Sequence, residues 1–157
     1  QAERAAAAAA RPARPAVSED ADLDAEIGAF FDRYAAAWDG FDVEALLDCL
    51  GFPHLIATRA GSHFFEDDAE ALVNLEKLIG KYRAAGVRRI HSLGLTVEAL
   101  PDNAARACVE WRLDDGAGAQ LLHFPTLFTL AKDDEGWHIV VIDAQGEADA
   151  WAGAGWA

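Results

Sequence analysis

The sequence predicts a single α+β domain, in which three helices cover one face of a curved antiparallel sheet. Three observations lead to this prediction. The chain has 157 residues, about the length of one ordinary domain. Apolar residues recur at helical spacing in the first half of the chain and alternate with polar residues in the second half. Helices grouped ahead of strands are typical of α+β proteins, whereas parallel α/β proteins alternate the two.

Three segments of the first half carry an apolar stripe at helical spacing. The first stripe begins at Leu23, among aspartates that suit the positive end of a helix dipole. Aspartate is a preferred N-cap, and Gly and Pro end helices. The sequence thus predicts, in order, a helix up to Gly40, a short helix from Asp42 to Gly51, strands at 54–58 and 62–66, and a helix from Asp67 or Asp68 to Gly86.

Four longer strands are predicted after the third helix, because apolar and polar residues alternate there between turn signals. The strand at 120–131 differs from the others in having two apolar faces. One face carries Leu122, Phe124, Thr126, Phe128 and Leu130, and the other carries Leu121, His123, Pro125, Leu127 and Thr129. The helices can bury only one face, so we expect a homodimer through the outer sheet face. An outer face covered from within the chain is the alternative.

The two ends of the chain differ in composition from its middle. Residues 1–21 are rich in Ala, Arg and Pro and carry no apolar stripe, so we expect a flexible tail or linker there. The chain starts with Gln and contains no Met, so we expect that it is trimmed, for example by removal of a targeting segment, or that it starts within a longer protein. Residues 22–147 form the expected domain. Residues 148–157 are expected as a C-terminal tail, although Trp151 and Trp156 are costly residues to leave in water.

The formal net charge of −14 is the strongest signal in the composition. A surface this acidic repels phosphate backbones and anionic lipids, so we expect neither nucleic acid nor a membrane as a partner. Cys49 and Cys108 lie within apolar patterns and form no CxxC pair, which favours reduced thiols in a cytoplasmic protein. The histidines are scattered without metal-binding spacing, so we expect no metal and no other cofactor.

The segment FFDRYAAAWDGFDVEALLDCL at residues 30–50 resembles the NTF2-like superfamily, and it is most similar to its ketosteroid-isomerase-like and SnoaL-like members. The resemblance covers about residues 22–146. It implies a cone-shaped, cystatin-like fold with three N-terminal helices packed on the curved sheet. It also implies an apolar pocket between the helices and the sheet.

The catalytic residues of the ketosteroid isomerases are only partly present. Tyr34 lies where those enzymes have a tyrosine that donates to the steroid oxyanion. Thr58 takes the place of the general base, an aspartate, and Thr126 that of a second, protonated aspartate. A threonine hydroxyl donates hydrogen bonds but does not abstract a carbon-bound proton at neutral pH. The sequence therefore excludes ketosteroid isomerase chemistry.

The same alignment predicts which residues face the pocket. Asp143 is expected to face inward from the last strand, where an apolar neighbourhood would raise its pKa and suit it to acid–base work. With Asp143 as acid or base, Tyr34 is the expected oxyanion donor and His91 or His54 the expected proton relay. The expected ligand-binding residues are Trp38, His54, Thr58, Trp111, Phe124, Thr126 and Phe128.

Three functions remain open at this point. The first is the binding of a small hydrophobic molecule in the pocket without catalysis. The second is a SnoaL-like enzyme, such as an isomerase, cyclase, dehydratase or hydrolase, that uses Asp143 and Tyr34. The third is a dimerisation scaffold whose cone is filled by its own Phe and Leu side chains.

Overall fold

The computed structural model describes residues 16–156, and it describes side-chain burial from residue 21. Residues 1–15 of the expected tail lie outside this part. Residues 16–21 are helical, so the expected start of the domain at residue 22 is too late. The physical reason is that acidic residues such as Glu19 and Asp20 suit the positive end of the helix dipole, which lets the first helix begin before its apolar stripe.

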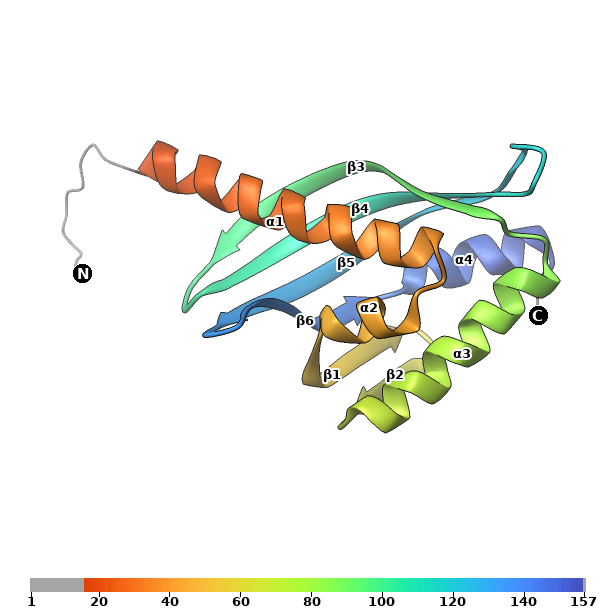
Figure 1. Cartoon of the computed structure of the whole chain (residues 1–157), viewed down its shortest axis with the longest axis horizontal. Helices are drawn as coiled ribbons and strands as arrows, with labels where there is room; N and C mark the ends of the chain where they lie inside the picture. Colours follow the sequence, from red (N-terminus) through yellow and green to blue (C-terminus); the bar gives the residue numbers. More distant parts are fainter. Residues whose placement is uncertain (1–15, 157) are drawn as a thin grey trace.

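The elements follow one another in the predicted order, helices first and long strands later (Figure 1). One further helix follows the last strand. The bounds are α1 Ala16–Asp39, α2 Val43–Asp48, β1 Leu50–Thr58, β2 Gly61–Phe65, α3 Asp68–Ala84, β3 Arg89–Leu100, β4 Ala104–Asp114, β5 Gln120–Asp133, β6 Gly136–Asp143 and α4 Gln145–Ala154.

The predicted caps of the two inner helices are confirmed. The Asp42 side chain accepts a hydrogen bond from the Ala45 N–H at 3.2 Å at the start of α2. Asp67 accepts one from the Glu70 N–H at 3.0 Å at the start of α3. These carboxylates satisfy N–H groups that have no partner within the helix, which fixes where each helix begins.

The six strands form one sheet in the order β2-β1-β6-β5-β4-β3. The four long strands pair antiparallel, as predicted. The pairing of β1 with β6 is parallel, so the expectation of a wholly antiparallel sheet is wrong at this pair. The short strands β1 and β2 do not form a separate hairpin. Strand β6 pairs with β5 on one side, and β1 pairs with its other side. The short strands thereby extend the sheet around the pocket.

Register shifts interrupt the ladders between β3 and β4, β4 and β5, β5 and β6, and β1 and β6. An extra residue at a bulge bends a strand and increases its local twist. The sheet is accordingly curved, and α1 lies across its inner face over β3, β4 and β5 (Figure 1).

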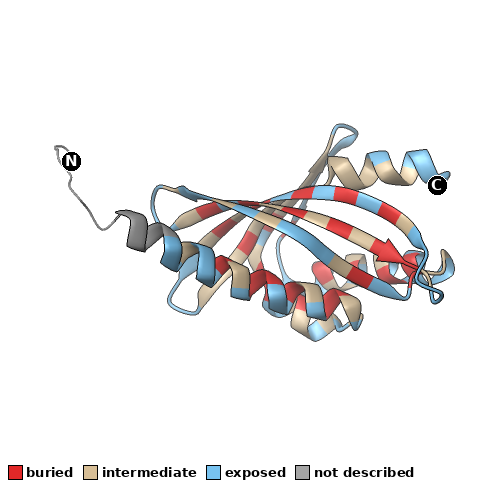
Figure 2. Ribbon diagram, turned by 90° about the horizontal axis from the view of Figure 1, so that it is seen from above, coloured by how far each residue is buried: buried red, intermediate tan, exposed pale blue. Residues whose placement is uncertain are grey.

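The core fills the space between α1 and the sheet. One side of α1 is buried along much of the helix, and this stripe faces the sheet (Figure 2). Phe31 packs on Phe128 of β5 with ring centroids 4.9 Å apart. Tyr34 packs on Trp111 of β4 at 6.1 Å. Aromatic pairs of this kind contribute beyond the area that they bury, so they fix how α1 sits on the sheet.

The C-terminal segment is the main departure from the predicted fold. Residues 145–154 form helix α4, so the expected tail at 148–157 is wrong for most of its length. Strand β6 pairs with β5 only from Leu127 onward, and α4 packs beside the earlier half of β5. A Cβ on Gly146 would collide with the Pro125 carbonyl oxygen, which shows how closely α4 approaches. The Trp151 ring docks on Tyr82 of α3 at 6.3 Å. Packing of this kind is what holds the segment in place.

Among residues 16–156, no helix is long and apolar enough to cross a membrane.

Candidate ligand-binding pocket

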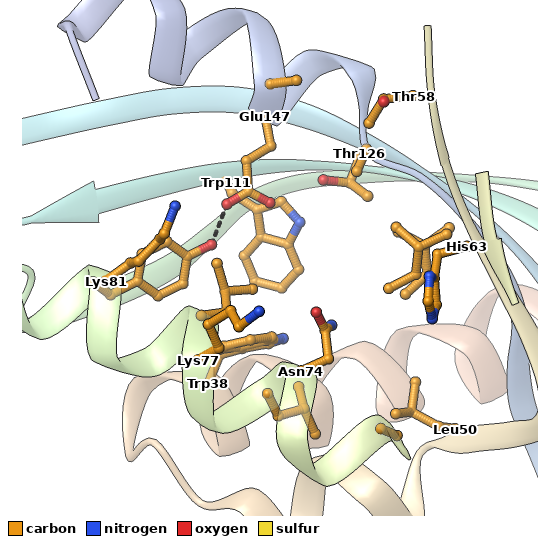
Figure 3. Close-up of a pocket in the computed structure, with 18 of the residues that line it drawn as sticks. Trp38, Leu50, Thr58, His63, Asn74, Lys77, Lys81, Trp111, Thr126 and Glu147 are labelled. Atoms are coloured by element: carbon orange, nitrogen blue, oxygen red, sulfur yellow. Dashed lines mark hydrogen bonds between the residues drawn. The ribbon is translucent and has the colours of Figure 1, made fainter. Parts of the chain in front are cut away.

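A cavity of about 790 Å³ lies between the inner face of the sheet and helices α1, α3 and α4. Helices α3 and α4 face each other across it, and β1 and β2 form a side wall (Figure 3). A cavity of this volume contradicts the alternative of a cone that is filled by its own side chains. It falls within the range of about 300–1,000 Å³ typical of small-molecule sites.

The walls are mostly apolar and come from almost every element. Aromatic rings form the deep part, with Trp38 from α1, Trp111 from β4 and Phe124 from β5. Such rings provide flat, rigid contact surfaces for an apolar ligand. The other apolar lining residues are Leu50, Ile56, Phe65, Ala71, Val73, Leu75, Leu78, Ile90, Leu113, Phe128, Ile142, Ala144, Ala148 and Trp151.

The polar groups divide into a mouth set and an inner set. Exposed side chains from β2 and α3 gather at the mouth, namely His63, Glu70, Lys77 and Lys81, and the half-buried Asn74 lies among them (Figure 3). The inner set contains the hydroxyls of Tyr34, Tyr82, Thr58 and Thr126, and a single carboxyl group, that of Glu147. A few polar groups in an apolar cavity are the usual means by which a site fixes the orientation of its ligand.

Glu147 reaches into the cavity from α4 and joins α4 to α3 (Figure 3). Its Oε2 accepts a hydrogen bond from the Tyr82 hydroxyl and a second one, of 3.1 Å, from the Trp151 indole N–H. Burial raises the pKa of the Glu147 carboxyl, and the hydrogen bonds from Tyr82 and Trp151 oppose that rise. A carboxyl with a raised pKa in an apolar cavity is suited to acid–base chemistry or to donating a hydrogen bond.

Tyr34 lies at the floor of the cavity and is almost fully buried, with 5% of its surface exposed. Burial raises the pKa of its hydroxyl, and a hydrogen bond with the Trp38 side chain opposes that rise. The phenol therefore stays protonated at neutral pH. It can act as a hydrogen-bond donor to a ligand oxygen, but not as a base.

The structure brings most of the predicted site residues to one cavity. The ones that line it are Tyr34, Trp38, Thr58, Trp111, Phe124, Thr126 and Phe128. Their alternation along β4 and β5 follows the sheet register, in which Trp111 pairs with Phe124 and Thr126 with Val109. Thr126 is 6% exposed and lies on the inner face as predicted.

Asp143 does not face the cavity, so its predicted place there is wrong. Its side chain is exposed, and its Oδ1 accepts a hydrogen bond from the Gln145 N–H at 3.1 Å. The reason is a bulge in β6, where β5 advances by one residue from Thr129 to Leu130 while β6 advances by two. The extra residue reverses the alternation, so that Ile142 lines the pocket and Asp143 lies opposite Leu127 on the outer face.

His91 is also misplaced by the prediction. Its Nε2 lies 2.9 Å from Oδ2 of Asp114, whose Oδ1 accepts a hydrogen bond of 2.6 Å from Nε of Arg112. His91 pairs with Arg112 across the β3–β4 ladder, whereas the neighbouring Trp111 faces inward. His91 therefore belongs to an ion-pair cluster on the outer face and cannot relay protons in the pocket.

His54 is buried but lies behind the pocket wall. It is 2% exposed, its ring stacks on Phe65 at 5.0 Å, and Phe65 is the residue that lines the cavity. Its Nδ1–H donates to the Gly51 carbonyl oxygen at 2.9 Å. Burial lowers the pKa of His54, and the bond to Gly51 opposes this effect. The predicted ligand-binding and relay roles of His54 are therefore wrong.

Glu147 and Tyr82 are not among the predicted site residues, because helix α4, which carries Glu147 into the cavity and against Tyr82 of α3, was not predicted. One signal could have indicated them. Glu147 and Trp151 are four residues apart, the spacing of neighbours on one helix face, and Trp151 is too apolar for a solvated tail. Within residues 16–156, no group of three or more His, Cys, Asp or Glu side chains could hold a metal ion.

Comparison with known sequences and structures shows that the chain is similar to NTF2-like proteins. A family described as "NTF2-like protein (DUF6841)" matches residues 25–147. A search of curated proteins found no match to this chain.

Several solved structures share the fold at low sequence identity. Aln2 from a Streptomyces species is 15% identical, with a TM-score of 0.66, over 84% of this chain and 96% of that protein. An NTF2-like protein of unknown function from Pseudomonas putida is 16% identical, with a TM-score of 0.64, over 78% and 85%. A protein from Mycobacterium tuberculosis, also of unknown function, is 21% identical, with a TM-score of 0.60, over 81% and 73%. At these identities the likeness shows the fold alone.

Proposed function

Since the chain belongs to this NTF2-like family, whose fold forms a cone around a cavity, we propose that it binds a small hydrophobic molecule there. One observation carries the proposal, namely an open cavity of about 790 Å³ that is lined mainly by aromatic and aliphatic side chains. When an apolar ligand replaces water against these walls, each Å² of apolar surface that is buried stabilises the complex by roughly 25 cal/mol. The aromatic walls favour a ligand that contains rings.

The proposed ligand is not processed by ketosteroid isomerase chemistry. Thr58 and Thr126 line the cavity at the two positions where the isomerases have aspartates. The Thr58 hydroxyl is 3.4 Å from the Gly61 carbonyl oxygen, which places it in a turn contact of its own strand pair. Neither hydroxyl can serve as a general base at neutral pH.

A binding titration tests the proposal. N-phenyl-1-naphthylamine, whose fluorescence rises in apolar surroundings, is titrated into the protein and into two variants of alanines on α4. Ala148 lines the cavity, whereas Ala152 is exposed. We expect Ala148→Phe to weaken binding about tenfold or more, because the ring fills ligand space, and Ala152→Phe to bind like the wild type. Equal affinity in all three proteins, or no binding, would contradict the proposal.

A catalytic function is the second candidate, and the position of Glu147 favours it. A carboxyl whose pKa is raised by burial, placed in an apolar cavity, is suited to proton transfer. Solvent-deuterium exchange into 2-tetralone, followed by proton NMR, tests this candidate. The carboxylate would take a proton from the carbon beside the carbonyl, the C–H electron pair would form the enolate, and solvent would return a deuteron. Exchange that is equally fast with Glu147→Gln would exclude the candidate.

We also propose that the partner of the outer sheet face is a second copy of this chain. Apolar side chains on this face are neighbours across the strands. Leu55 of β1 pairs with Phe64 of β2 and with Val141 of β6. Leu127 of β5 pairs with Asp143, two residues further along β6. Phe64 is 57% exposed and Leu127 is 43% exposed. Glu98 on this face is paired with Arg106, whose Nη1 lies 3.2 Å from the Glu98 Oε1. Paired charges reduce the repulsion between two chains that each carry a charge of −14.

The free thiols of Cys49 and Cys108 support a reducing compartment such as the cytoplasm. Burial raises the pKa of Cys49 to about 11, so this thiol stays protonated and unreactive.

A further inference from the structure

Glu147, Tyr82 and Trp151 form one hydrogen-bonded cluster at the wall of the cavity. Both donors, the Tyr82 hydroxyl and the Trp151 indole N–H, reach the same carboxyl oxygen, Oε2. An indole N–H can only donate, so Oε2 must act as an acceptor. When Glu147 is protonated, a proton on Oε1 leaves both of these hydrogen bonds in place, with Tyr82 and Trp151 as the donors.

The second oxygen of Glu147 is available to a ligand. Oε1 makes no hydrogen bond to any residue in the described part of the chain, 16–156. Glu147 is half-buried and lines the cavity, and its carboxyl group points from α4 toward the Trp111 ring (Figure 3). A hydrogen-bonding atom that faces an apolar space gains most from a partner on the ligand, because nothing else satisfies it there.

We propose that Glu147 selects the ligand, by donating a hydrogen bond from Oε1 to an uncharged acceptor oxygen, such as a ketone or quinone carbonyl, on an otherwise apolar ring system. This inference rests on the proposed binding function and adds the chemical class of the ligand. Tyr82 and Trp151 hold the carboxyl group so that its proton points into the cavity. Trp111 provides a flat surface beside the acceptor.

The surroundings of Glu147 favour the neutral acid. Burial is the largest influence on its pKa and raises it, and the two hydrogen bonds act in the opposite direction. Besides Glu147, the titratable groups that line the cavity are Tyr34 of α1, His63 of β2, and Glu70, Lys77, Lys81 and Tyr82 of α3. The tyrosines stay uncharged, since burial raises the pKa of each hydroxyl. Lys81 is exposed, and its Nζ lies 5.0 Å from the centroid of the Trp151 ring.

The class of ligand follows from this arrangement. A neutral donor binds a carbonyl oxygen and gains nothing from a methylene group in the same position. An ammonium group on the ligand would instead require the ionised carboxylate. An anionic group would lack a donor once Glu147 ionises. The cluster therefore distinguishes a ring ketone from a hydrocarbon of the same shape.

A matched pair of ligands tests the inference. 9-Fluorenone and fluorene have the same ring skeleton and differ in one carbonyl oxygen, and fluorenone has no proton that could be abstracted. Dissociation constants for both are measured by tryptophan fluorescence quenching with the wild type, Glu147→Gln and Glu147→Ala. The ratio of the two constants within each protein removes the difference in hydrophobicity between the ligands.

We expect the ratio to favour fluorenone by roughly five- to tenfold more in the wild type than in Glu147→Ala, as for one neutral hydrogen bond. Glu147→Gln should keep the preference, because its amide group both donates and accepts. With rising pH, the wild type should lose the preference as Glu147 ionises, whereas Glu147→Gln should keep it. A purely structural role for Glu147 would give no such pH dependence.

The two proposals fail in different ways. If neither compound binds to the wild type, the proposed binding function fails and this inference fails with it. If both bind and the ratio is the same in the wild type and Glu147→Ala, the pocket binds ligands but Glu147 does not select them. Circular dichroism and urea unfolding of each variant establish that it is folded. If Glu147→Ala does not fold, the contrast between the wild type and Glu147→Gln across pH decides the question.

Discussion

Glu147 ties the stability of the fold to pH, because its pKa is raised by burial in the folded state. The folded protein then holds a proton on Glu147 at pH values where the unfolded chain has released it. Stability falls as pH rises from the ordinary carboxyl pKa, 4.5, toward the higher pKa of the folded state.

We therefore expect Glu147→Gln to gain stability relative to the wild type as pH rises from 5 to 8. The slope of this difference cannot exceed about 1.4 kcal/mol per pH unit, which is the limit for a single proton. Urea unfolding of both proteins at several pH values measures the difference. A constant difference across the range would show that the pKa of Glu147 is not raised.

His54 links stability to pH in the opposite sense. Burial holds its pKa below the ordinary value of 6.5, so the unfolded chain binds a proton that the folded protein does not. Stability contributed by the neutral ring is present above about pH 6.5 and is lost as pH falls below it.

The variant His54→Phe should remove this acid sensitivity, since Phe52 and Phe65 already form an aromatic site around the ring. Between pH 7.5 and 5.5, the wild type should lose about 1 kcal/mol relative to the variant. Thermal unfolding at the two pH values measures the change. Parallel loss of stability in both proteins would mean that His54 is protonated in the folded state.

Single residues could be predicted from the sequence where strict alternation holds. Trp111, Phe124 and Thr126 lie on uninterrupted stretches of β4 and β5, and the pattern places them on the inner face. Asp143 follows the bulge in β6, where one extra residue reverses the faces. No residue type in that segment marks the bulge, so the sequence could not show it.

At the level of elements, α4 is the segment that completes the pocket. It contributes Glu147, Ala148 and Trp151 to the lining and packs along the half of β5 that β6 leaves unpaired. Its close approach to the strand depends on Gly146, since any Cβ there would collide with the Pro125 backbone.

Two glycine substitutions within α4 should consequently have opposite effects. Gly146→Ala should destabilise the protein by about 1–3 kcal/mol, because the helix must move away from Pro125. Gly153→Ala should stabilise it by about 0.5 kcal/mol, because Ala has the higher helix propensity and no atom lies within 4 Å of the new methyl group. Urea unfolding measures both. A neutral Gly146→Ala would mean that α4 is not held against β5.

The helices differ in how readily the sequence reveals them. Both α2 and α3 have aspartate caps and apolar stripes, which gave their starting residues. Helix α4 has no side-chain cap and is rich in Ala and Gly, so local pattern gives little indication of it. Tertiary packing of Trp151 against α3 stabilises it, and such contacts cannot be seen in a local sequence pattern.

The outer sheet face determines how the whole molecule is expected to assemble. If a second copy covers this face, Leu127→Glu should convert a dimer into a monomer, because it places a charge in a contact that excludes water. Val73→Glu is the matched control, since Val73 is an exposed residue of α3, away from the outer face. Sedimentation equilibrium measures both. A monomeric wild type at every concentration would exclude the dimer.

The fold as a whole could be predicted because the order of elements and the segment at residues 30–50 agree with each other. The function could not, since the fold serves unrelated activities and the pocket residues from α4 lie outside the recognised pattern. Tyr34 and Thr126 were correctly placed in the same cavity, whereas the carboxyl group that shares it with them was found only in the structure.

Ligand binding and its selection by Glu147 both depend on an open pocket that accepts an apolar ligand beside this residue. A crystal structure of the protein grown with 9-fluorenone tests this most directly. The predicted result is a ring system next to Trp111, with its carbonyl oxygen about 2.5–3.0 Å from Oε1 of Glu147. A cavity closed by its own side chains, or fluorenone bound only elsewhere on the molecule, would contradict both the proposed binding and the proposed role of Glu147.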